Sequence, residues 1–449
     1  MYKHCKTAAA VAALLLGAGA ARADDTATVN GITFYGTVDV GLTYDTHGAP
    51  SSTIGSVGSA YLIQKMSNRS TFNFAESGMG QSRLGLKGAD DLGNGWSGIF
   101  KLEAAINPAG GNVTDALKSL TNNNGVAQAN QSVGVDSSAA GQAFARAAYV
   151  GVSNDTYGTL TLGRQTTLTA DAISAYDPLY NSYAFSLIGF SGTAAGSGST
   201  EDTRWDNSIK YLVGYGPFRA GAMMQLGGDI TRNDTGAGGD LGFDWQGFSA
   251  DAVYTHKKDE VSMGSLSAAQ VITAQSLGYN PQNSLSATVS DNDSYTFAAK
   301  YTWEKFKFFA GYEYIRSKDP SSPLQVGFTD IGSYTGAIVN NTAFAKNRHQ
   351  QIEWGGVRYQ VLPKLEIDGA YYHISQNSYA TGANSNCSDN RASNCSGDEH
   401  VFSLMADYHF SKRFDTYAGA SYSQVINGLA AGYYHNNNID PTVGVRYTF

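Results

Sequence analysis

The chain of 449 residues contains only three cysteines and nine prolines, and its basic residues form no cluster. Acidic residues outnumber basic ones by 38 to 30, so a nucleic-acid partner is not expected. No apolar run of about 20 residues follows the N-terminal segment, which argues against a transmembrane helix. The sequence also lacks the Gly-x-Ser-x-Gly, His-Glu-x-x-His and P-loop motifs, so no familiar enzyme class is indicated.

Glycine and aromatic residues are abundant instead, with 52 Gly, 28 Tyr and 20 Phe, while the mean hydropathy is −0.26. This combination is unusual for a soluble domain. It suits a structure in which apolar residues are dispersed at every second position.

The first residues have the pattern of a secretory signal peptide. Two lysines precede an apolar run from Ala8 to Leu16, and an A-x-A cleavage pattern ends at Ala23. We expect residues 1–23 to be removed on export and residues 24–449 to fold as one domain. The leader holds three basic residues and no acidic one, so the exported chain has 27 basic and 38 acidic residues, a formal charge of −11.

Apolar and polar residues alternate with a period of two along most of the chain. In GITFYGTVDVGLTYD the even-numbered residues are mostly apolar and the odd-numbered residues mostly polar. Sixteen such segments are predicted as strands, over residues 32–45, 80–89, 96–107, 144–153, 158–167, 204–215, 218–228, 239–246, 248–258, 294–304, 306–317, 348–361, 364–376, 400–411, 413–426 and 440–449.

The links between these strands are alternately short and long. The long links are Asn107–Ala143, Thr169–Thr203, Glu260–Asn292 and Asp319–Asn347. This alternation is typical of an outer-membrane β-barrel, in which short periplasmic turns alternate with long outer loops. Because strands in lipid cannot leave backbone groups unpaired, we expect the last strand to close onto the first. A secreted β-sandwich or jelly roll is the alternative, but it would not need so many aromatic residues at strand ends.

Several segments resemble the general porins of Gram-negative outer membranes, in particular the trimeric beta-proteobacterial type. They are SRLGLKGADDLGNGWSGIFKLE (Ser82–Glu103), FARAAYVGVSNDTYGTLTLGRQ (Phe144–Gln165), RWDNSIKY (Arg204–Tyr211) and the terminal VGVRYTF. The resemblance extends from near Val29 to Phe449. The chain departs from the family pattern at Asp90 and at Tyr447, where the family usually has Glu and His.

The resemblance implies a homotrimer of water-filled barrels in outer-membrane lipid, through which ions and small hydrophilic solutes diffuse. It also implies that the terminal aromatic, Phe449, is the signal recognised by the barrel-assembly machinery, although Phe449 also suits a simple role in the aromatic girdle. In the family the third loop folds inward to form the constriction. Here that loop is Thr169–Thr203, and its residues Asp171 and Asp177 are predicted to line the constriction.

Basic residues on the opposite wall are expected to face these acids. Strand alternation places Arg83 inward, because Leu84 and Leu86 take the lipid face. The same alternation places Arg204 inward, opposite in parity to Trp205. The inward placement of Arg146 rests on the resemblance alone.

Arg164 does not fit the inward pattern, because it shares parity with Leu160 and Leu162. An arginine on the lipid face costs about 2–4 kcal/mol near the middle of the membrane. Either a β-bulge turns Arg164 inward, or Arg164 contacts another subunit. We favour the subunit contact, since the family is trimeric.

The remaining candidate sites are two cysteines and two histidines. Cys387 and Cys395 lie in a polar stretch between strands, and export to an oxidising compartment predicts a disulfide between them. Cys5 leaves with the signal peptide, and no cysteine lies at the cleavage point, which argues against a lipoprotein. His373 and His409 lie on neighbouring strands but have no third ligand, so no metal site and no cofactor are predicted.

Two other functions remain as alternatives to a general porin. A substrate-specific channel would use an aromatic track, for which Tyr176, Tyr180, Tyr183 and Phe185 of the third loop are candidates. An outer-membrane barrel hydrolase would release product from a lipid or peptide substrate, whereas a porin would conduct ions without turnover.

Overall fold

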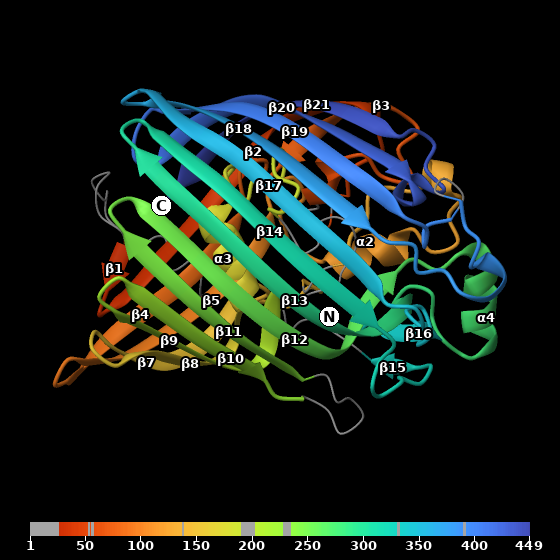
Figure 1. The fold of residues 1–449 in the computed structure, drawn as a ribbon, viewed down its shortest axis with the longest axis horizontal. Coiled ribbons are helices and arrows are strands. Elements are labelled where there is room, and N and C mark those ends of the chain that lie inside the picture. The colour runs from red at the N-terminus through yellow and green to blue at the C-terminus, as the bar shows by residue number, and fades with distance from the viewer. Residues whose placement is uncertain are drawn as a thin grey trace, which may run out of the picture.

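In the computed structural model, antiparallel strands surround a central lumen and close on themselves (Figure 1). The structure describes residues 27–449 except residues 53, 55–57, 137–138, 190–202, 228–234, 330–332 and 389–391. The predicted signal peptide, residues 1–23, lies outside this part of the chain. The Gly/Ser-rich end of the predicted third loop lies outside it as well.

Sixteen strands form the wall of the barrel, as predicted, when β3 and β4 are counted as one interrupted strand. The wall strands are β2 (Ile32–Gly48), β3 (Arg69–Glu76) with β4 (Arg83–Gly93), β5 (Trp96–Asn107), β7 (Ala147–Asn154), β8 (Gly158–Thr166), β9 (Arg204–Tyr215), β10 (Phe218–Gln225), β11 (Gly236–Trp245), β12 (Phe248–Gly264), β13 (Ser284–Trp303), β14 (Phe306–Lys318), β17 (Arg348–Leu362), β18 (Leu365–Gln376), β19 (Gly397–His409), β20 (Phe414–Asn427) and β21 (Asn437–Thr448).

The first and last wall strands close the barrel. β2 pairs with β21 from Thr37 opposite Thr448 to Thr43 opposite Thr442. Beyond this ladder, the backbone groups of Gly36 and Phe449 exchange two hydrogen bonds of 3.0 Å. The Phe449 ring also lies 5.4 Å from the ring of Phe34. The closing pair predicted from the sequence is therefore confirmed.

The second wall strand runs alongside β2 and is interrupted between Glu76 and Arg83. β4 pairs with the first part of β2, and β3 pairs with the second part. At the break Ser77 has a positive φ of 61°. The fully buried carboxylate of Asp39 fills the gap by accepting hydrogen bonds from the backbone N–H groups of Met79 (2.8 Å) and Gly80 (2.9 Å). The sequence prediction missed β3, since residues 69–76 had not been assigned to a strand.

Apolar side chains cover the outer face of the wall, and polar side chains dominate its inner face. Outward residues such as Leu162, Phe297 and Leu404 are exposed, whereas inward residues such as Asp251 and Thr296 are buried. Every second residue is apolar because it meets lipid, while its neighbours face the lumen. This is the alternation from which the strands were predicted.

Two strands extend further than their apolar pattern indicated. β12 continues to Gly264 and β13 begins at Ser284, so the predicted loop 260–292 shrinks to residues 265–283. The added part of β13 contains the polar run 290–293, whose residues are buried. A strand that has left the lipid no longer needs an apolar face, and the alternation that marks a strand is then lost.

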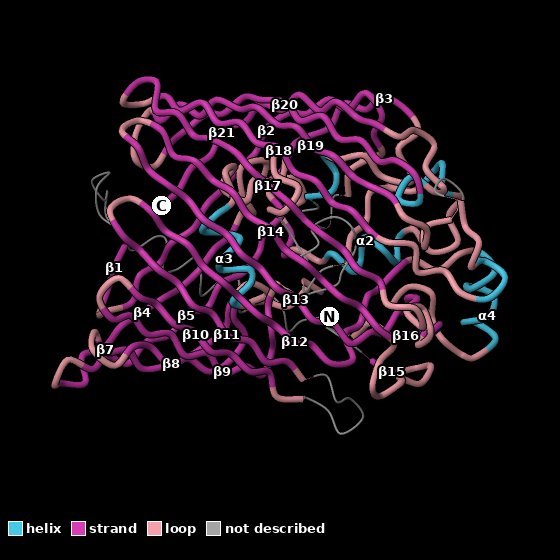
Figure 2. Tube along the Cα trace, in the orientation of Figure 1, coloured by secondary structure: helices cyan, strands magenta, loops and turns pink. Residues whose placement is uncertain are grey.

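The loops at one end of the barrel carry additional short elements (Figure 2). These elements are the strands β6 (Asn112–Val113), β15 (Phe328–Thr329) and β16 (Thr335–Asn340), the helices α2 (Ala116–Asn122) and α4 (Ala268–Ser276), and the 3₁₀ turns η1 (Gly58–Tyr61), η2 (Gln128–Asn130), η3 (Gly382–Asn384) and η4 (Gly428–Ala430). The short strand β1 (Ala27–Val29) pairs with β2. No helix among the described residues is long and apolar enough to cross a membrane. The remaining helix, α3 (Leu168–Tyr176), lies inside the barrel.

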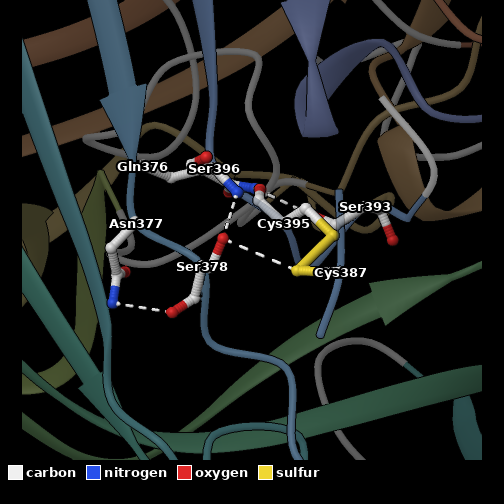
Figure 3. The surroundings of a disulfide bond; sticks show 7 residues. All are labelled: Gln376, Asn377, Ser378, Cys387, Ser393, Cys395 and Ser396. Carbon is white, nitrogen blue, oxygen red and sulfur yellow. Dashed lines mark hydrogen bonds between the residues drawn. A yellow bond between two sulfur atoms is a disulfide. The ribbon is translucent and has the colours of Figure 1, made fainter. Parts of the chain in front are cut away.

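The predicted disulfide is present in the loop between β18 and β19 (Figure 3). Cys387 and Cys395 are joined with a Cα–Cα distance of 5.9 Å. The hydroxyl of Ser378 lies 3.5 Å from the sulfur of Cys387 and accepts a hydrogen bond of 2.8 Å from the N–H of Ser396. The bridge therefore ties the loop to the end of β18.

Replacing Cys387 and Cys395 by serine is expected to weaken this loop but not the channel. The enclosed segment is short, so the bridge should contribute at most about 2–3 kcal/mol. We expect a small fall in the thermal unfolding temperature and an unchanged single-channel conductance. Equal labelling of the parent protein by a thiol reagent with and without reductant would contradict the bridge.

Candidate functional site

The segment after β8 turns into the lumen instead of continuing as a surface loop. Its helix, α3, begins after Thr167, whose side chain accepts a hydrogen bond from the N–H of Ala170 as an N-cap. At the far end of the helix, the Tyr176 carbonyl accepts a hydrogen bond of 3.0 Å from Trp354 of β17. The hydroxyl of Tyr176 also lies 2.7 Å from that of Ser249 on β12. The helix is therefore fixed against the inner wall.

Asp177, directly after α3, is a structural anchor and not a lumen-facing acid. Its carboxylate is fully buried and accepts hydrogen bonds from the Tyr372 hydroxyl (2.5 Å) and the backbone N–H groups of Leu179 (3.2 Å) and Asn181 (2.7 Å). Burial raises the pKa of Asp177, and these hydrogen bonds oppose the shift. The prediction that Asp177 lines the constriction is wrong, because tertiary contacts with β18 remove its carboxylate from water.

Two cations of the wall hold the same segment through backbone carbonyls. Arg358 donates to the carbonyls of Pro178 (2.6 Å) and Asp177 (2.8 Å), and its guanidinium lies 3.3 Å from the centre of the Tyr180 ring. Lys300 donates to the carbonyl of Ala175 at 3.0 Å. Since these carbonyls are neutral, neither contact pairs the cation with an acid.

The loop then crosses the lumen to the opposite wall. The N–H of Ala184 donates to the carbonyl of Gly78 at 2.9 Å, and the Phe185 ring packs edge-on against Tyr417 with 6.2 Å between centroids. Large buried side chains along this path form the main apolar cluster of the protein. The third loop therefore narrows the lumen, as the resemblance implied.

A cluster of cations surrounds one acid on the wall beside this loop. Glu103 of β5 lies 2.6 Å from Arg146, 3.3 Å from Lys101 and 3.9 Å from Arg83. The Tyr35 hydroxyl donates a further hydrogen bond of 2.7 Å to Glu103. The Glu103 side chain is only 5% exposed, whereas those of Arg83 and Lys101 are 33% and 32% exposed. Three positive charges thus face one buried negative charge.

The third loop approaches this cluster through Tyr183. Burial raises the pKa of Tyr183, while the positive charges of Arg146, Arg204 and Arg83 act in the opposite direction. Arg204 in turn donates to the carbonyl of Arg146 at 2.9 Å. The structure therefore brings together the three arginines that the sequence analysis selected.

The alternation argument used for Arg204 does not hold, because β9 contains a bulge. Two residues of β9, Asp206 and Asn207, lie opposite the single residue Arg164 of β8, and Asn207 has a φ of 49°. Trp205 is consequently turned inward, where it is almost fully buried and Lys257 lies 5.7 Å from its ring centre. The prediction that Trp205 faces lipid is therefore wrong.

Arg164 keeps the outward parity that the sequence indicated. It pairs with Ala148 across β7 and β8, two positions from the exposed pair Val150 and Leu162. Its guanidinium donates to the Ala145 carbonyl (2.8 Å) and to Asp206 (2.7 Å). The bulge lies in β9 and not at Arg164, so it does not turn Arg164 inward. Contact of Arg164 with another subunit stays a prediction.

Asp171 of α3 is half-exposed and forms an ion pair with Lys210 of β9. It also accepts a hydrogen bond of 2.6 Å from the Thr166 hydroxyl. The predicted acid therefore lies inside the barrel, but its charge is balanced by its partner.

The sequence analysis missed Lys101, Glu103, Lys300 and Arg358. Lys101 and Glu103 could have been found by alternation, because Phe100 and Leu102 take the other face of β5. No local signal marks Lys300 or Arg358, since their contacts with the loop are made only in the folded barrel.

Comparisons with known proteins agree with this architecture. The model of the Gram-negative porin family matches residues 8–427. An outer membrane porin protein of Bordetella pertussis is 24% identical over 440 residues, covering 92% of this chain and 93% of the relative. Outer membrane porin protein 32 of Delftia acidovorans is 28% identical over 211 residues, 46% of each chain.

Solved porin structures share the fold. The anion-selective porin from Comamonas acidovorans superposes with a TM-score of 0.59 at 18% identity, over 93% of this chain and 99% of that one. OmpT of Vibrio cholerae superposes with a TM-score of 0.57 at 15% identity, over 95% and 100% of the two chains. The chain therefore belongs to the Gram-negative porin family, as an outer-membrane protein that forms a channel for the diffusion of small hydrophilic solutes.

Proposed function

We propose that this porin is a general diffusion channel that favours small anions over cations. The observation that carries the proposal is the cluster at Glu103, where Arg83, Lys101 and Arg146 surround one buried carboxylate. Selectivity in a wide channel depends on the charges at its narrowest point. The overall charge of the protein matters less, because charges further away than about 8 Å are largely screened at physiological salt.

Other charges near the third loop also support a preference for anions. Lys300 contacts a neutral carbonyl, and Asp171 is balanced by Lys210. Arg358 contacts two neutral carbonyls and lies opposite the buried Asp368. Asp177, which would have opposed the arginines, is buried away from the lumen. The relative from Comamonas acidovorans is described as anion-selective, which agrees with the proposal.

The reversal potential in a planar bilayer under a potassium chloride gradient tests this proposal. We expect the sign that corresponds to chloride permeation, with a magnitude that decreases at high salt as the charges are screened. A reversal potential with the sign expected for potassium permeation at low salt would contradict the anion preference. It would not affect the assignment to the porin family. Saturable conductance with one sugar or amino acid would instead favour a substrate-specific channel.

The aromatic residues of the third loop give little support to a substrate-specific channel. Tyr176 and Phe185 are fully buried and Tyr183 nearly so, so they fix the loop to the wall. Tyr180 is 39% exposed and stacks on Arg358, and one exposed ring does not form a track. We likewise propose passive diffusion without catalysis. Release of product from a lipid or peptide substrate by the purified protein would contradict this.

We also propose that the protein assembles as a homotrimer, with Arg164 near the subunit contact. One structure of Vibrio cholerae OmpT with this fold is described as a trimer form. Replacing Arg164 by alanine is expected to lower the temperature at which the oligomer separates in detergent, because Asp206 loses its partner on the outer face. Single-channel conductance should stay nearly unchanged, and the reverse pattern would place Arg164 in the lumen.

Two proposals concern biogenesis. We propose that residues 1–23 are cleaved as a signal peptide during export, which the N-terminal sequence of the purified protein would test. We also propose that Phe449 is recognised by the barrel-assembly machinery. Its pairing with Gly36 and its proximity to Phe34 are equally compatible with a role in the girdle.

A further inference from the structure

A second group of charged side chains lies on the inner wall, where β19 and β20 meet at a short turn. Asp407 and His409 are two residues apart on β19 and so share a face, while Asp415 of β20 lies directly opposite His409. Short turns mark the periplasmic end of an outer-membrane barrel. This group shares no residue with the Glu103 cluster, which lies on β4, on β5 and directly before β7.

The donor atoms of these three residues are close enough to share one ion. The Nε2 atom of His409 lies 3.6 Å from Oδ2 of Asp407, and its Nδ1 atom lies 4.0 Å from Oδ2 of Asp415. One ligand atom from each residue can be chosen so that all lie within 4.8 Å of one another. Ligands around a tetrahedral zinc ion with bonds of about 2.1 Å are separated by about 3.4 Å, and only one imidazole nitrogen binds the ion, so the side chains have to close by up to about 1.4 Å.

Two of the carboxylates are buried with an oxygen that has no hydrogen-bond partner. Asp407 and Asp415 are 2% and 6% exposed, and the Oδ1 atom of each lacks a partner among the described residues. Buried carboxylate oxygens are normally satisfied, so these atoms require a proton, a water molecule or a cation. The His409 side chain is 43% exposed and leaves the group open to the lumen.

The surrounding charge favours a cation. Glu366 of β18 lies opposite Asp407, and Asp368 is fully buried with neither carboxylate oxygen hydrogen-bonded among the described residues. The guanidinium of Arg446 contacts Oδ2 of Asp415 at 3.0 Å and Oδ2 of Asp407 at 3.6 Å. Arg358 of β17 lies opposite Asp368, so two arginines face four carboxylates and the acids remain in excess.

We propose that Asp407, His409 and Asp415 bind a divalent transition-metal ion such as Zn²⁺ on the periplasmic side of the lumen. An imidazole and two carboxylates are suitable zinc ligands, and the aqueous lumen can supply water for an open coordination position. A bound ion adds two positive charges to an otherwise acidic patch. It therefore increases the preference of the channel for anions, an effect that rests on the proposed function, whereas the binding itself does not.

The sequence analysis could not identify this site, because it considered His409 together with His373. The structure separates these histidines. His373 pairs with His400 in the β18–β19 ladder and contacts Glu353 and Asp398. The acidic residues near His409 are instead Asp407 of its own strand and Asp415 of the next strand.

Isothermal titration of the purified full-length porin with zinc chloride tests the site. We expect one Zn²⁺ per chain, with binding weakened by about tenfold or more in His409→Ala and in the pair Asp407→Asn with Asp415→Asn. The control is His373→Ala, which removes a histidine that also has two acidic neighbours and should leave binding unchanged. Unweakened binding in His409→Ala, or a loss in His373→Ala, would overturn the proposal. Circular dichroism establishes that each variant is folded.

The reversal potential tests the effect of the ion on permeation. Zinc chloride added to the short-turn side should shift the potential of the parent toward anions and leave that of folded His409→Ala unchanged. The measurement without zinc tests the anion preference separately, so failure of the proposed function and failure of the metal site are distinguishable. Equal shifts in both proteins would overturn an effect through this site.

Discussion

Replacing Arg83 and Lys101 by glutamate is expected to change the porin from anion preference to cation preference. Both side chains are about one-third exposed beside Glu103, so the double variant converts a group of three cations and one acid into one cation and three acids. A unit charge about 5 Å from a permeating ion changes its energy in water by about 0.8 kcal/mol, which corresponds to about a fourfold change in relative permeability. Reversal potentials at low salt measure the change.

The matched control for this variant is Lys412→Glu with Arg413→Glu. These residues lie in the turn between β19 and β20, outside the Glu103 cluster, and produce the same change in total charge. We expect the control to shift the reversal potential much less, and both shifts to shrink at high salt. Equal shifts in the two double variants would show that selectivity depends on total charge and not on the Glu103 cluster.

Replacing Asp177 by alanine is expected to release the third loop and enlarge the channel. The substitution leaves the Tyr372 hydroxyl and the N–H groups of Leu179 and Asn181 without their acceptor. Each unsatisfied buried group costs about 1–3 kcal/mol, so a loss of about 3 kcal/mol or more is expected. Single-channel recordings should show a larger and noisier conductance, with a lower unfolding temperature.

Two further variants calibrate the effect of Asp177→Ala. Tyr372→Phe removes one donor but keeps the packing of the ring, so it should cost only about 1 kcal/mol. Asp171→Ala removes an acid of the same type from the same loop, but one that is half-exposed and bound to Lys210 and Thr166 near the start of the loop. If Asp171→Ala raised the conductance as much as Asp177→Ala, Asp177 would not be the principal anchor.

Strand alternation was reliable where the wall meets lipid. Leu84 and Leu86 must be apolar there, so the inward placement of Arg83 followed directly, and its proximity to Glu103 is observed. Alternation failed at β9, because the extra residue at Asn207 turns Trp205 inward and places Asp206 beside the outward Arg164. The bulge cannot be recognised from the sequence, because Asp206 and Asn207 are both polar and either could be the extra residue.

The loop residues were less predictable for a different reason. Asp177 and Asp171 are both acids of the same loop, yet the first is buried and the second is half-exposed. The difference arises from Tyr372 and Lys210, which are distant in sequence and belong to different strands. The end of β12 and the start of β13 were missed because they lie beyond the lipid. A strand there does not need an apolar residue at every second position.

The closure of the barrel has a consequence for the order of folding. β2 pairs with β21 between residues about 400 positions apart, as in the pairing of Thr37 with Thr448. Contacts of such long sequence separation form slowly, because the entropy of closing the intervening chain is lost before the contacts are gained. Until β21 is in place, β2 and β20 each expose a free edge that lipid cannot satisfy. The open sheet therefore has to be shielded from both the bilayer and other open chains until its final strand arrives.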